Sequence, residues 1–504
     1  MNRKFALGAL LLGIVILLAL LLRVSVAFAF PNILWSDEIF QTLEPAHRLT
    51  YGNGIVTWEF RRGTRSLVFP GILAGVMRLT DWMGDGSSGY LAGVTIFLCL
   101  LSLIPILVAF LWGYRTSGLI AAILSAGICS IWFELVYFAP KAFNEVVAAY
   151  LLLAGVYLGV HGRVFQPRMR LFLAGCLCGS AIALRIHLLP AVVFAMVYIC
   201  RKDWRARWVP MVAGILGPIL AFGVVDAFTW SYPFQSFWQN VWVNVVLGKS
   251  EQYGVSPWYG YLSFLRNSWS WALVPITLLA IVGARRSPIL AWLVIVIVLS
   301  HSVLAHKEYR FIYPALPMIL ILAGLGTAEL VTRWRLRWSS PRVMVIAVLV
   351  CLILWTSTSA ILASRFDPTR KTTLSILWAA PETTYWQRFS GNLLAFQKLS
   401  TEQTLCGVGL LGINWYRSGG YTYLHRDVPI FLVEQDTDFN QLAPSFNYLV
   451  ATVSVPRQHQ DYVLQGFWGT TCLYKRPGSC TQRRGYSINQ VIKQKQQWED
   501  PGSM

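Results

Sequence analysis

Residues 5–48 read FALGALLLGIVILLALLLRVSVAFAFPNILWSDEIFQTLEPAHR, an apolar run followed at once by a cluster of ionisable side chains. The run from Phe5 to Leu22 has about the length that a membrane-spanning helix requires. Basic residues precede it, which predicts an uncleaved signal-anchor with a cytoplasmic N-terminus. The alternative, cleavage after the small residues of Ala27-Phe28-Ala29, stays open.

The composition of the whole chain excludes a soluble globular protein. Of the 504 residues, 56% are hydrophobic and only 13% are charged, and long apolar runs recur over the first 360 positions. We therefore expect a polytopic α-helical membrane protein with about eleven transmembrane helices. The expected spans are 5–22, 88–112, 117–133, 142–161, 171–187, 188–201, 208–228, 267–284, 288–305, 310–332 and 341–362.

The arginines between these spans predict the topology. Positive charge in short loops marks the cytoplasmic side of a membrane, which explains the net charge of +19 better than nucleic-acid binding does. The pattern holds if Leu67–Met83, although apolar, stays on the outer surface; as a full span it would reverse every later loop. The loops 31–66 and 229–266 then lie outside. The arginine-rich inner connections hold Arg115, Arg168, Arg170, Arg201, Arg205, Arg207, Arg285, Arg286, Arg333 and Arg342.

A change in composition divides the chain. We expect a transmembrane catalytic domain over 1–364 and a C-terminal extracytoplasmic α/β-type domain over 365–504, which has strand-like runs, Gly-rich turns and a flexible tail. Cys472 and Cys480 can form a disulfide there if the domain faces an oxidising compartment, but Cys406 is an equally available partner.

Two stretches carry candidate chemistry. The first outer loop begins with adjacent carboxylates, Asp37 and Glu38, at a water–lipid boundary, where ionisable groups are costly unless they have partners or a task. Any one of them alone would fit a solvated loop. Residues 306–314 place His306, Lys307 and Arg310 at an outer helix end, which suits an anionic headgroup; the alternative is that the long side chains simply reach water.

At these stretches the chain resembles the dolichyl-phosphate-mannose-dependent mannosyltransferases of glycosyltransferase family 22, which includes the Alg9-like and GPI mannosyltransferases. HKEYRFIYP at 306–314 is similar to the family signature HKExRF(I/L)(Y/F)P, in the wording of the GPI mannosyltransferase 3 type. The likeness covers about 1–360. It departs from the pattern at Ser36, where Pro is common, and at Ser256, where His is common. Further matching segments, in order, are Asp37-Glu38, 44–48, 52–54, 57–59, Arg65-Ser66, 139–141, Glu145 and 244–261.

This resemblance implies a GT-C fold and a non-cytoplasmic active site. The enzyme would move a mannosyl or other hexosyl unit from a polyprenyl- or dolichyl-phosphate donor to a glycan or glycolipid acceptor. Asp37 would be the catalytic base, with Glu38 orienting the acceptor hydroxyl or pairing with a cation. Direct displacement would invert the anomeric carbon. The donor phosphate would be bound by His306, Lys307, Arg310, Arg185 and His187. The acceptor side would be lined by Glu44, His47, Trp58, Glu59 and Arg65.

We expect no metal or other cofactor, because a monophosphate donor lacks the diphosphate that a divalent ion usually holds. The expected partners are the lipid bilayer, the donor and the acceptor, without nucleic acid. A bacterial inner membrane with a periplasmic site is favoured over the endoplasmic reticulum. A lipid or solute transporter is the competing class, since charges and interrupted helices suit it equally. An inactive sugar-binding scaffold is a third.

Overall fold

The computed structural model describes residues 3–162, 165–335, 340–367, 385–433, 436–452, 461–481 and 486–497. The chain forms two compact units. The first, here called the helical unit, combines 1–28, 98–224 and 248–384. The second, called the sheet unit, combines 29–97, 225–247 and 385–504. The expected division at 364/365 stays a prediction, and each unit is described below by itself.

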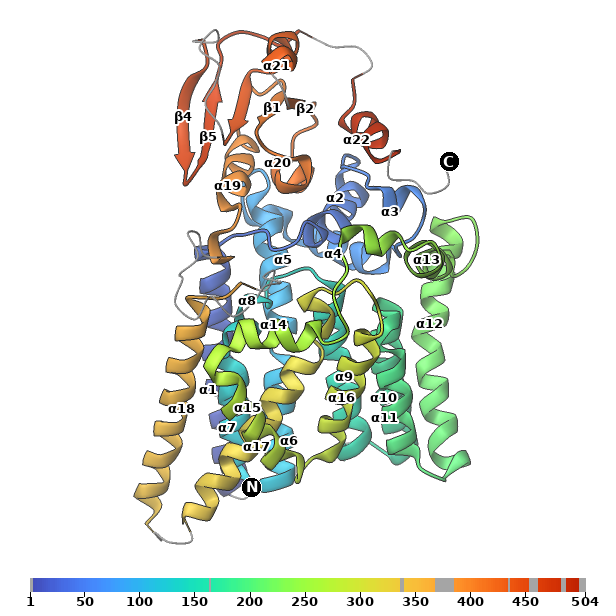
Figure 1. The fold of residues 1–504 in the computed structure, drawn as a ribbon, viewed down its shortest axis with the longest axis vertical. Coiled ribbons are helices and arrows are strands. Elements are labelled where there is room, and N and C mark those ends of the chain that lie inside the picture. The colour runs from blue at the N-terminus through green and yellow to red at the C-terminus, as the bar shows by residue number, and fades with distance from the viewer. Residues whose placement is uncertain are drawn as a thin grey trace. The chain divides into compact units, whose positions relative to one another are not determined.

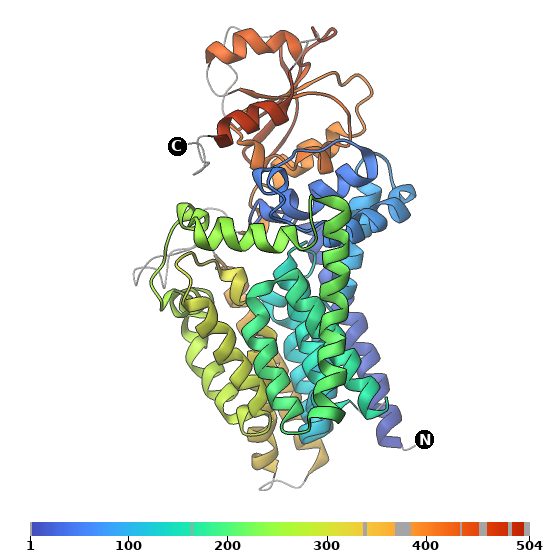
Figure 2. The same ribbon diagram turned by 90° about the vertical axis from the view of Figure 1, so that its right-hand side faces the viewer.

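Eight helical stretches in the described part of the chain are long and apolar enough to cross a membrane (Figures 1 and 2). An apolar sequence of this length can satisfy every backbone group only as a helix in lipid. The helices that form them are α1 (Arg3–Ala29), α5 (Ser88–Leu101) with α6 (Ile104–Ser117), α9 (Asn144–His161), α10 (Pro167–Leu184), α12 (Val209–Thr229), α14 (Gly260–Trp269) with α15 (Leu273–Ala284), α17 (Ala315–Arg335) and α18 (Pro341–Ala363).

Three shorter apolar helices coincide with the remaining predicted spans. They are α7 (Leu119–Ile131), α11 (Leu189–Cys200) and α16 (Pro288–Ser302). At 1.5 Å per residue, such helices cover only about 20 Å of a hydrocarbon core of about 30 Å. The count of eleven transmembrane helices therefore stays a prediction, although every segment predicted as a span is helical.

Close helix packing fixes α17, which follows directly after the 306–314 stretch. A Cβ atom added at Gly283 would lie 2.0 Å from Leu322 O, and one at Gly326 would lie 2.0 Å from Leu279 O. Small residues let helices approach in lipid, where no hydrophobic effect drives them together. Figures 1 and 2 show α15 and α17 side by side. This packing against α15 therefore holds α17 in place.

A buried arginine joins α1 to the end of α7. Arg23 is fully buried and donates to Cys129 O at 3.0 Å and to Ser130 O at 2.9 Å. These carbonyls belong to the last turn of α7, which leaves its C=O groups without intrahelical donors. Arg23 supplies the missing donors in the helical unit.

The sheet unit contains a five-stranded sheet in the order β2-β1-β3-β5-β4. β1 (Val408–Leu411) pairs in parallel with β2 (Ile430–Val433) and with β3 (Tyr448–Ala451). β5 (Thr471–Lys475) is antiparallel to β3 and to β4 (Val463–Trp468). A core of aromatic and aliphatic side chains, among them Phe439 and Phe446, packs on this sheet.

The part of the chain that forms the sheet also contains short helices, and a disulfide joins the two ends of the segment 406–480. Cys406 is bonded to Cys480, so of the alternatives left open by the sequence the structure selects this pair; Cys472 on β5 is a free thiol. In register, Val408 of β1 is level with Ile430 and Tyr448. The helices are α19 (Ser390–Leu399), α20 (Gly420–Leu424), α21 (Asp436–Leu442) and α22 (Ile488–Gln497).

The two predicted outer loops are largely helical. Residues 31–66 hold the π-helical turn η1 (Ile39–Leu43), α2 (Glu44–Tyr51) and α3 (Trp58–Arg61). The next helix, α4 (Val68–Thr80), has 13 residues, and the predicted position of Leu67–Met83 on the outer surface stays a prediction. The second loop holds α13 (Gln235–Val241). The remaining short elements are η2 (Asp81–Met83), α8 (Phe133–Tyr137), η3 (Ile186–Leu188), η4 (Trp204–Trp208), η5 (Trp242–Val246), η6 (Lys249–Tyr253), η7 (Ser270–Ala272), η8 (Tyr309–Ile312), η9 (Tyr385–Gln387), η10 (Trp415–Arg417) and η11 (Ala443–Ser445).

Candidate active site

A buried carboxylate anchors the 306–314 stretch of the helical unit. Glu134, in α8, has no exposed surface. Its Oε2 accepts from the indole N–H groups of Trp132 and Trp269, each at 2.8 Å. Its Oε1 accepts from Ser268 Oγ at 2.7 Å and from the Tyr309 hydroxyl. Burial raises the pKa of Glu134, while these four donors lower it. We call this arrangement the Glu134 cage; it fixes Tyr309, the residue before Arg310.

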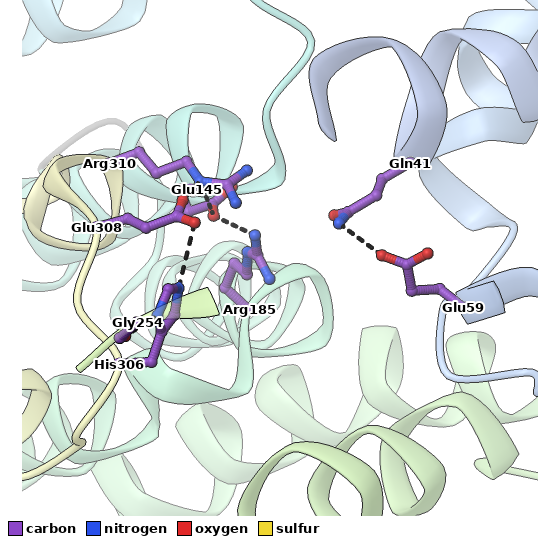
Figure 3. A network of polar contacts seen from close by, with 8 residues as sticks. All are labelled: Gln41, Glu59, Glu145, Arg185, Gly254, His306, Glu308 and Arg310. Atoms are coloured by element: carbon purple, nitrogen blue, oxygen red, sulfur yellow. Dashed lines mark hydrogen bonds and ion pairs between the residues drawn. The ribbon is translucent and has the colours of Figure 1, made fainter. Parts of the chain in front are cut away.

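An ionic network surrounds Arg310 (Figure 3). Arg310 Nε lies 2.5 Å from Glu308 Oε2 and 3.6 Å from Glu145 Oε1. Arg185, at the C-terminal end of α10, donates to the same Glu145 oxygen. Arg310 is only 3% exposed, and its guanidinium lies over the rings of Phe143 and Phe311. The structure therefore brings together Arg185 and Arg310, two of the predicted phosphate-binding residues.

The hydrogen bonds of His306 fix its protonation. Its Nδ1 lies 2.7 Å from Gly254 O, and its Nε2 lies 3.2 Å from Glu308 Oε1. A carbonyl and a carboxylate both only accept, so each ring nitrogen must carry a hydrogen and the ring is a cation. Burial alone would lower the pKa of His306, but the bonds to Glu308 and Gly254 and the Glu308 charge raise it overall.

A small pocket opens beside this network. Its lining brings His187 together with Arg185, as the sequence predicted for the donor side. The His187 ring is stacked on Phe311, with an interplanar angle of 12°. Lys307 is directed elsewhere: its ammonium donates to Ser256 O at 3.1 Å and to Leu304 O, and its role at a phosphate stays a prediction. The pocket is lined by Glu145, Arg185, His187, Leu188, His301, Phe311 and Pro314.

The predicted catalytic pair lies in the sheet unit. Asp37 is half-buried and opens the helical turn that continues into η1. Glu38 is 4% exposed, and its Oε1 accepts from Leu34 N at 3.0 Å. The two side chains are thus in different surroundings, as expected for neighbours on one backbone, and Glu38 shapes the turn that presents Asp37.

Glu44 and His47 have structural partners within the sheet unit. Glu44 is fully buried and accepts from Ile55 N, Tyr421 N, Thr422 N and Thr422 Oγ1, at 2.7, 2.9, 2.8 and 2.6 Å. A Cβ at Gly420 would lie 2.6 Å from Glu44 Oε2, so glycine allows this approach. This geometry favours a structural role for Glu44, in which it holds α20, rather than the predicted contact with an acceptor.

His47 is likewise enclosed. Its Nδ1 lies 2.9 Å from Asn53 O and its Nε2 lies 3.2 Å from His425 Nδ1. Burial lowers the pKa of His47 to about 4; the Asn53 carbonyl opposes this and His425 adds to it. The ring is therefore neutral near pH 7. It packs against Tyr51, Tyr90 and His425.

Glu59, Trp58 and Arg65 form the more accessible part of the predicted acceptor side. Gln41 Nε2 donates to Glu59 Oε1 at 3.1 Å (Figure 3). Burial raises the pKa of Glu59, the charge of Arg65 lowers it, and the charge of Asp37 raises it. Trp58 and Arg65 are half-buried. Because the charges of Asp37 and Arg65 both act on Glu59, these groups lie in one region of the sheet unit.

Several residues of the site carried no assigned role in the sequence prediction. Glu134, Glu145 and His301 are ionisable residues in largely apolar stretches, which is itself a signal of a partner or a task. Glu308 was part of the motif but had no role. Among the described residues, no group of three or more His, Cys, Asp or Glu side chains could hold a metal ion.

Comparison with known proteins agrees with the resemblance seen in the motifs. A family model described as the Alg9-like mannosyltransferase family matches residues 14–425. GPI alpha-1,2-mannosyltransferase 3 of Danio rerio is 27% identical over 315 residues, which are 59% of this chain and 56% of that protein. GPI mannosyltransferase 3 of Yarrowia lipolytica is 25% identical over 433 residues, 82% of this chain and 75% of that one. The predicted family and its GPI mannosyltransferase 3 type are confirmed.

A solved structure supports the fold. ArnT from Cupriavidus metallidurans, determined with bound undecaprenyl phosphate, superimposes with a TM-score of 0.59 at 12% identity, covering 95% of this chain and 99% of that one. The predicted polytopic helical GT-C architecture is thereby confirmed. The chain spans just over half the length of the zebrafish relative, so activity, donor and acceptor are treated as proposals.

Proposed function

The chain belongs to the Alg9-like mannosyltransferase family, and from this premise we propose that it transfers a mannosyl, or other hexosyl, unit from a polyprenyl- or dolichyl-phosphate donor to a glycan or glycolipid acceptor. The reaction would be a single displacement that inverts the anomeric carbon. Breaking the bond between the anomeric carbon and the phosphate oxygen leaves the electron pair on the lipid phosphate.

The observation that carries the proposal is the gathering of cations around Arg310. Arg185, Arg310 and protonated His306 lie in one network with two carboxylates, Glu145 and Glu308. A phosphodiester donor carries one negative charge, and its phosphate gains another as the bond breaks. Preorganised cations that stabilise such developing charge supply a large part of many rate enhancements. Arginine adds the geometry for two-pronged phosphate binding.

On the acceptor side, Asp37 would remove the proton of the attacking hydroxyl. Asp37 is half-buried, whereas Glu38 is 4% exposed and accepts from Leu34 N, so Asp37 is the more exposed of the two carboxylates. Glu59, Trp58 and Arg65 would bind the acceptor. We assign Glu44 and His47 to the scaffold of this region because their polar atoms already have partners.

The arginine distribution supports a non-cytoplasmic site. Glu145 begins α9 and Arg185 follows α10, so the network lies at one end of this antiparallel pair. Arg168 and Arg170 lie at the other end, where positive charge marks the cytoplasm. The chain is an integral membrane protein, and its named relatives are eukaryotic, which favours the endoplasmic reticulum over the bacterial inner membrane expected from the sequence.

A direct test uses purified protein, polyprenyl-phosphate mannose with a labelled sugar, and glycolipid acceptors. Arg310→Ala should lower kcat/KM by about 10²-fold or more, because one preorganised cation is lost. Arg286→Ala is the matched control, since Arg286 is half exposed and is paired with Glu329 at 2.7 Å. An active Arg310→Ala enzyme would contradict the phosphate assignment.

A second test addresses the base. Asp37→Asn should reduce turnover about 10²- to 10⁴-fold with normal folding, while Asp85→Asn, an exposed carboxylate in the same unit, should not. Full activity of Asp37→Asn would remove that residue from the role. We also expect activity to persist in excess chelator; strict dependence on added divalent ion would contradict the metal-free reaction.

A further inference from the structure

The helix that follows α12 in the sheet unit has one exposed apolar side. α13 continues directly into η5, so residues 235–246 form one helical segment, here called the α13–η5 helix. Its large exposed side chains recur at intervals that place them on one face of a helix. They are Trp238 (59% exposed), Trp242 (55%), Val245 (57%) and Val246 (57%).

The other side of the α13–η5 helix is packed within the sheet unit. Ser236 donates to Asp226 Oδ2 through its backbone N–H at 2.9 Å and through its Oγ at 2.6 Å. Asn240 Nδ2 donates to Thr64 O at 3.4 Å. Val243 is buried on the same side, with 1% of its surface exposed. The helix is therefore fixed by one side, and its apolar side faces outward.

The position of this helix in the chain places it at the edge of a membrane. The stretch 204–229, which includes α12, is long and apolar enough to cross a bilayer. Asp226 belongs to the last turn of α12, so the bonds from Ser236 hold the start of the α13–η5 helix beside the end of a span. Tryptophan is enriched where a membrane meets water, and a helix with one apolar face lies in the plane of that boundary.

The composition of this stretch decides between possible partners. A contiguous apolar face on a protein surface marks contact with lipid or with another protein. Recognition of an ion or a charged headgroup would need a counter-charge, but residues 227–248 contain no charged side chain. Phospholipid is present beside the end of every spanning helix, so it covers this face without a further protein.

We propose that the apolar side of the α13–η5 helix docks into the boundary layer of the bilayer, where Trp238, Trp242, Val245 and Val246 contact phospholipid acyl chains. Because the packed side of the helix is bonded to Thr64, this contact ties the turn before Arg65 to the membrane surface. The inference goes beyond the proposed function and does not depend on it.

The test uses the wild-type protein in phosphatidylcholine nanodiscs that contain a lipid with a photoreactive diazirine in its acyl chain. After illumination, mass spectrometry should find lipid on peptides of 235–247 at a yield about tenfold or more above that on β4, because an open sheet edge does not lie in hydrocarbon. β4 is an edge strand, and its Phe467 is 70% exposed, which matches the tryptophans in exposure. Adding anionic phosphatidylglycerol should leave the yield unchanged. Equal yields on the two segments would overturn the proposal.

A photoreactive side chain at the surface itself identifies the partner independently. Trp242→p-benzoyl-phenylalanine and Phe467→p-benzoyl-phenylalanine each replace one exposed aromatic group by another. The probe at position 242 should form a lipid adduct and the probe at 467 should not. A crosslink from position 242 to a protein chain in place of lipid would overturn the bilayer as the partner. Neither measurement needs catalytic turnover, so its failure would leave the transferase proposal standing, and the wild-type labelling decides the question if a probe variant fails to fold.

Discussion

Glu134 and Glu145 are two carboxylates of the same unit, eleven positions apart, and both are almost completely buried. Glu134 has two neutral donors on each oxygen. Glu145 has two guanidinium groups on one oxygen, while its other oxygen has no partner in the described part of the chain and belongs to a residue that lines a pocket.

The difference separates a carboxylate whose two oxygens both have donors from one with a buried oxygen that lacks a donor among the described residues. A carboxylate whose oxygens already have donors cannot accept another hydrogen bond without losing an existing one. An oxygen without a donor can still accept a hydrogen bond. Glu44 repeats the saturated pattern in the sheet unit: each of its oxygens has two donors, and three of the four donors belong to α20. Burial alone does not distinguish these residues; the number of donors on each oxygen does.

The largest effect should come from replacing each carboxylate by its amide. In Glu134→Gln the new NH₂ group faces two donors, and we expect a loss of about 4 kcal/mol in unfolding free energy. In Glu145→Gln the NH₂ group can take the side without a donor, so its loss, about 3 kcal/mol, comes from the buried guanidinium groups that lose their counter-charge. Denaturant and thermal unfolding in detergent, with and without phosphate, would measure both variants. Phosphate should restore stability to Glu145→Gln and leave Glu134→Gln unchanged, and an equal response of the two variants would contradict the distinction.

The buried and hydrogen-bonded His47 provides a test of the same idea in the sheet unit, through the pH dependence of its stability. Burial lowers the pKa of His47 from its ordinary 6.5 to about 4, so the unfolded chain binds the proton more readily. The stabilisation is complete above pH 6.5 and is lost as the pH falls toward 4, by about 3 kcal/mol at most. His425, Tyr51, Tyr90 and Asp81 face or influence the ring. His47→Gln should show a shallower acid-induced fall in melting temperature, and an unchanged slope would contradict this account.

The affinity for phosphate provides a further test of the difference between Glu145 and Glu134. Removing its charge in Glu145→Gln leaves the neighbouring guanidinium groups less neutralised. Inorganic phosphate, measured by calorimetry, should therefore bind about tenfold more tightly, a gain of about 1.4 kcal/mol. Glu329→Gln serves as the control at an exposed pair. Weaker phosphate binding in Glu145→Gln would show that this carboxylate does not compete with the anion.

The smallest effect concerns the partner of His306. Its raised pKa means that the stabilisation from the charged ring is complete below about pH 6.5 and is lost as the pH rises through the folded-state pKa. Glu308→Gln removes the charge that favours this cation, so the alkaline decline of donor kcat/KM should move to lower pH by about half a unit. A profile that does not move would mean that another group titrates.

The apolar runs were sufficient to predict the helices, because in lipid each segment must satisfy its own backbone. The exact number of crossings was less accessible, since α7, α11 and α16 are shorter than a membrane is thick. The position of the 31–66 loop outside the membrane stays a prediction, and its short helices depend on packing that no local periodicity reveals.

The candidate site was predicted in part. The motif at 306–314 drew attention to Arg310 and His306, and the charge at an outer helix end drew attention to Arg185. The carboxylate that joins Arg185 to Arg310, Glu145, had no assigned role. The cages were missed because their contacts join distant residues: Glu134 meets Trp269 across 135 positions, and Glu44 meets Thr422 across 378. Which oxygen of a carboxylate is occupied is a property of three-dimensional packing, and one sequence does not contain it in readable form.

The disulfide between Cys406 and Cys480 connects the folding of this segment to the cellular compartment in which it lies. Thiols are kept reduced in the cytosol and are oxidised after export. The disulfide closes a segment that contains all five strands. If residues 365–504 lie outside the cytoplasm, as expected from the sequence, this closure follows translocation. A chain stalled during export would then carry two free thiols here, so the redox state of this pair would report whether export was completed.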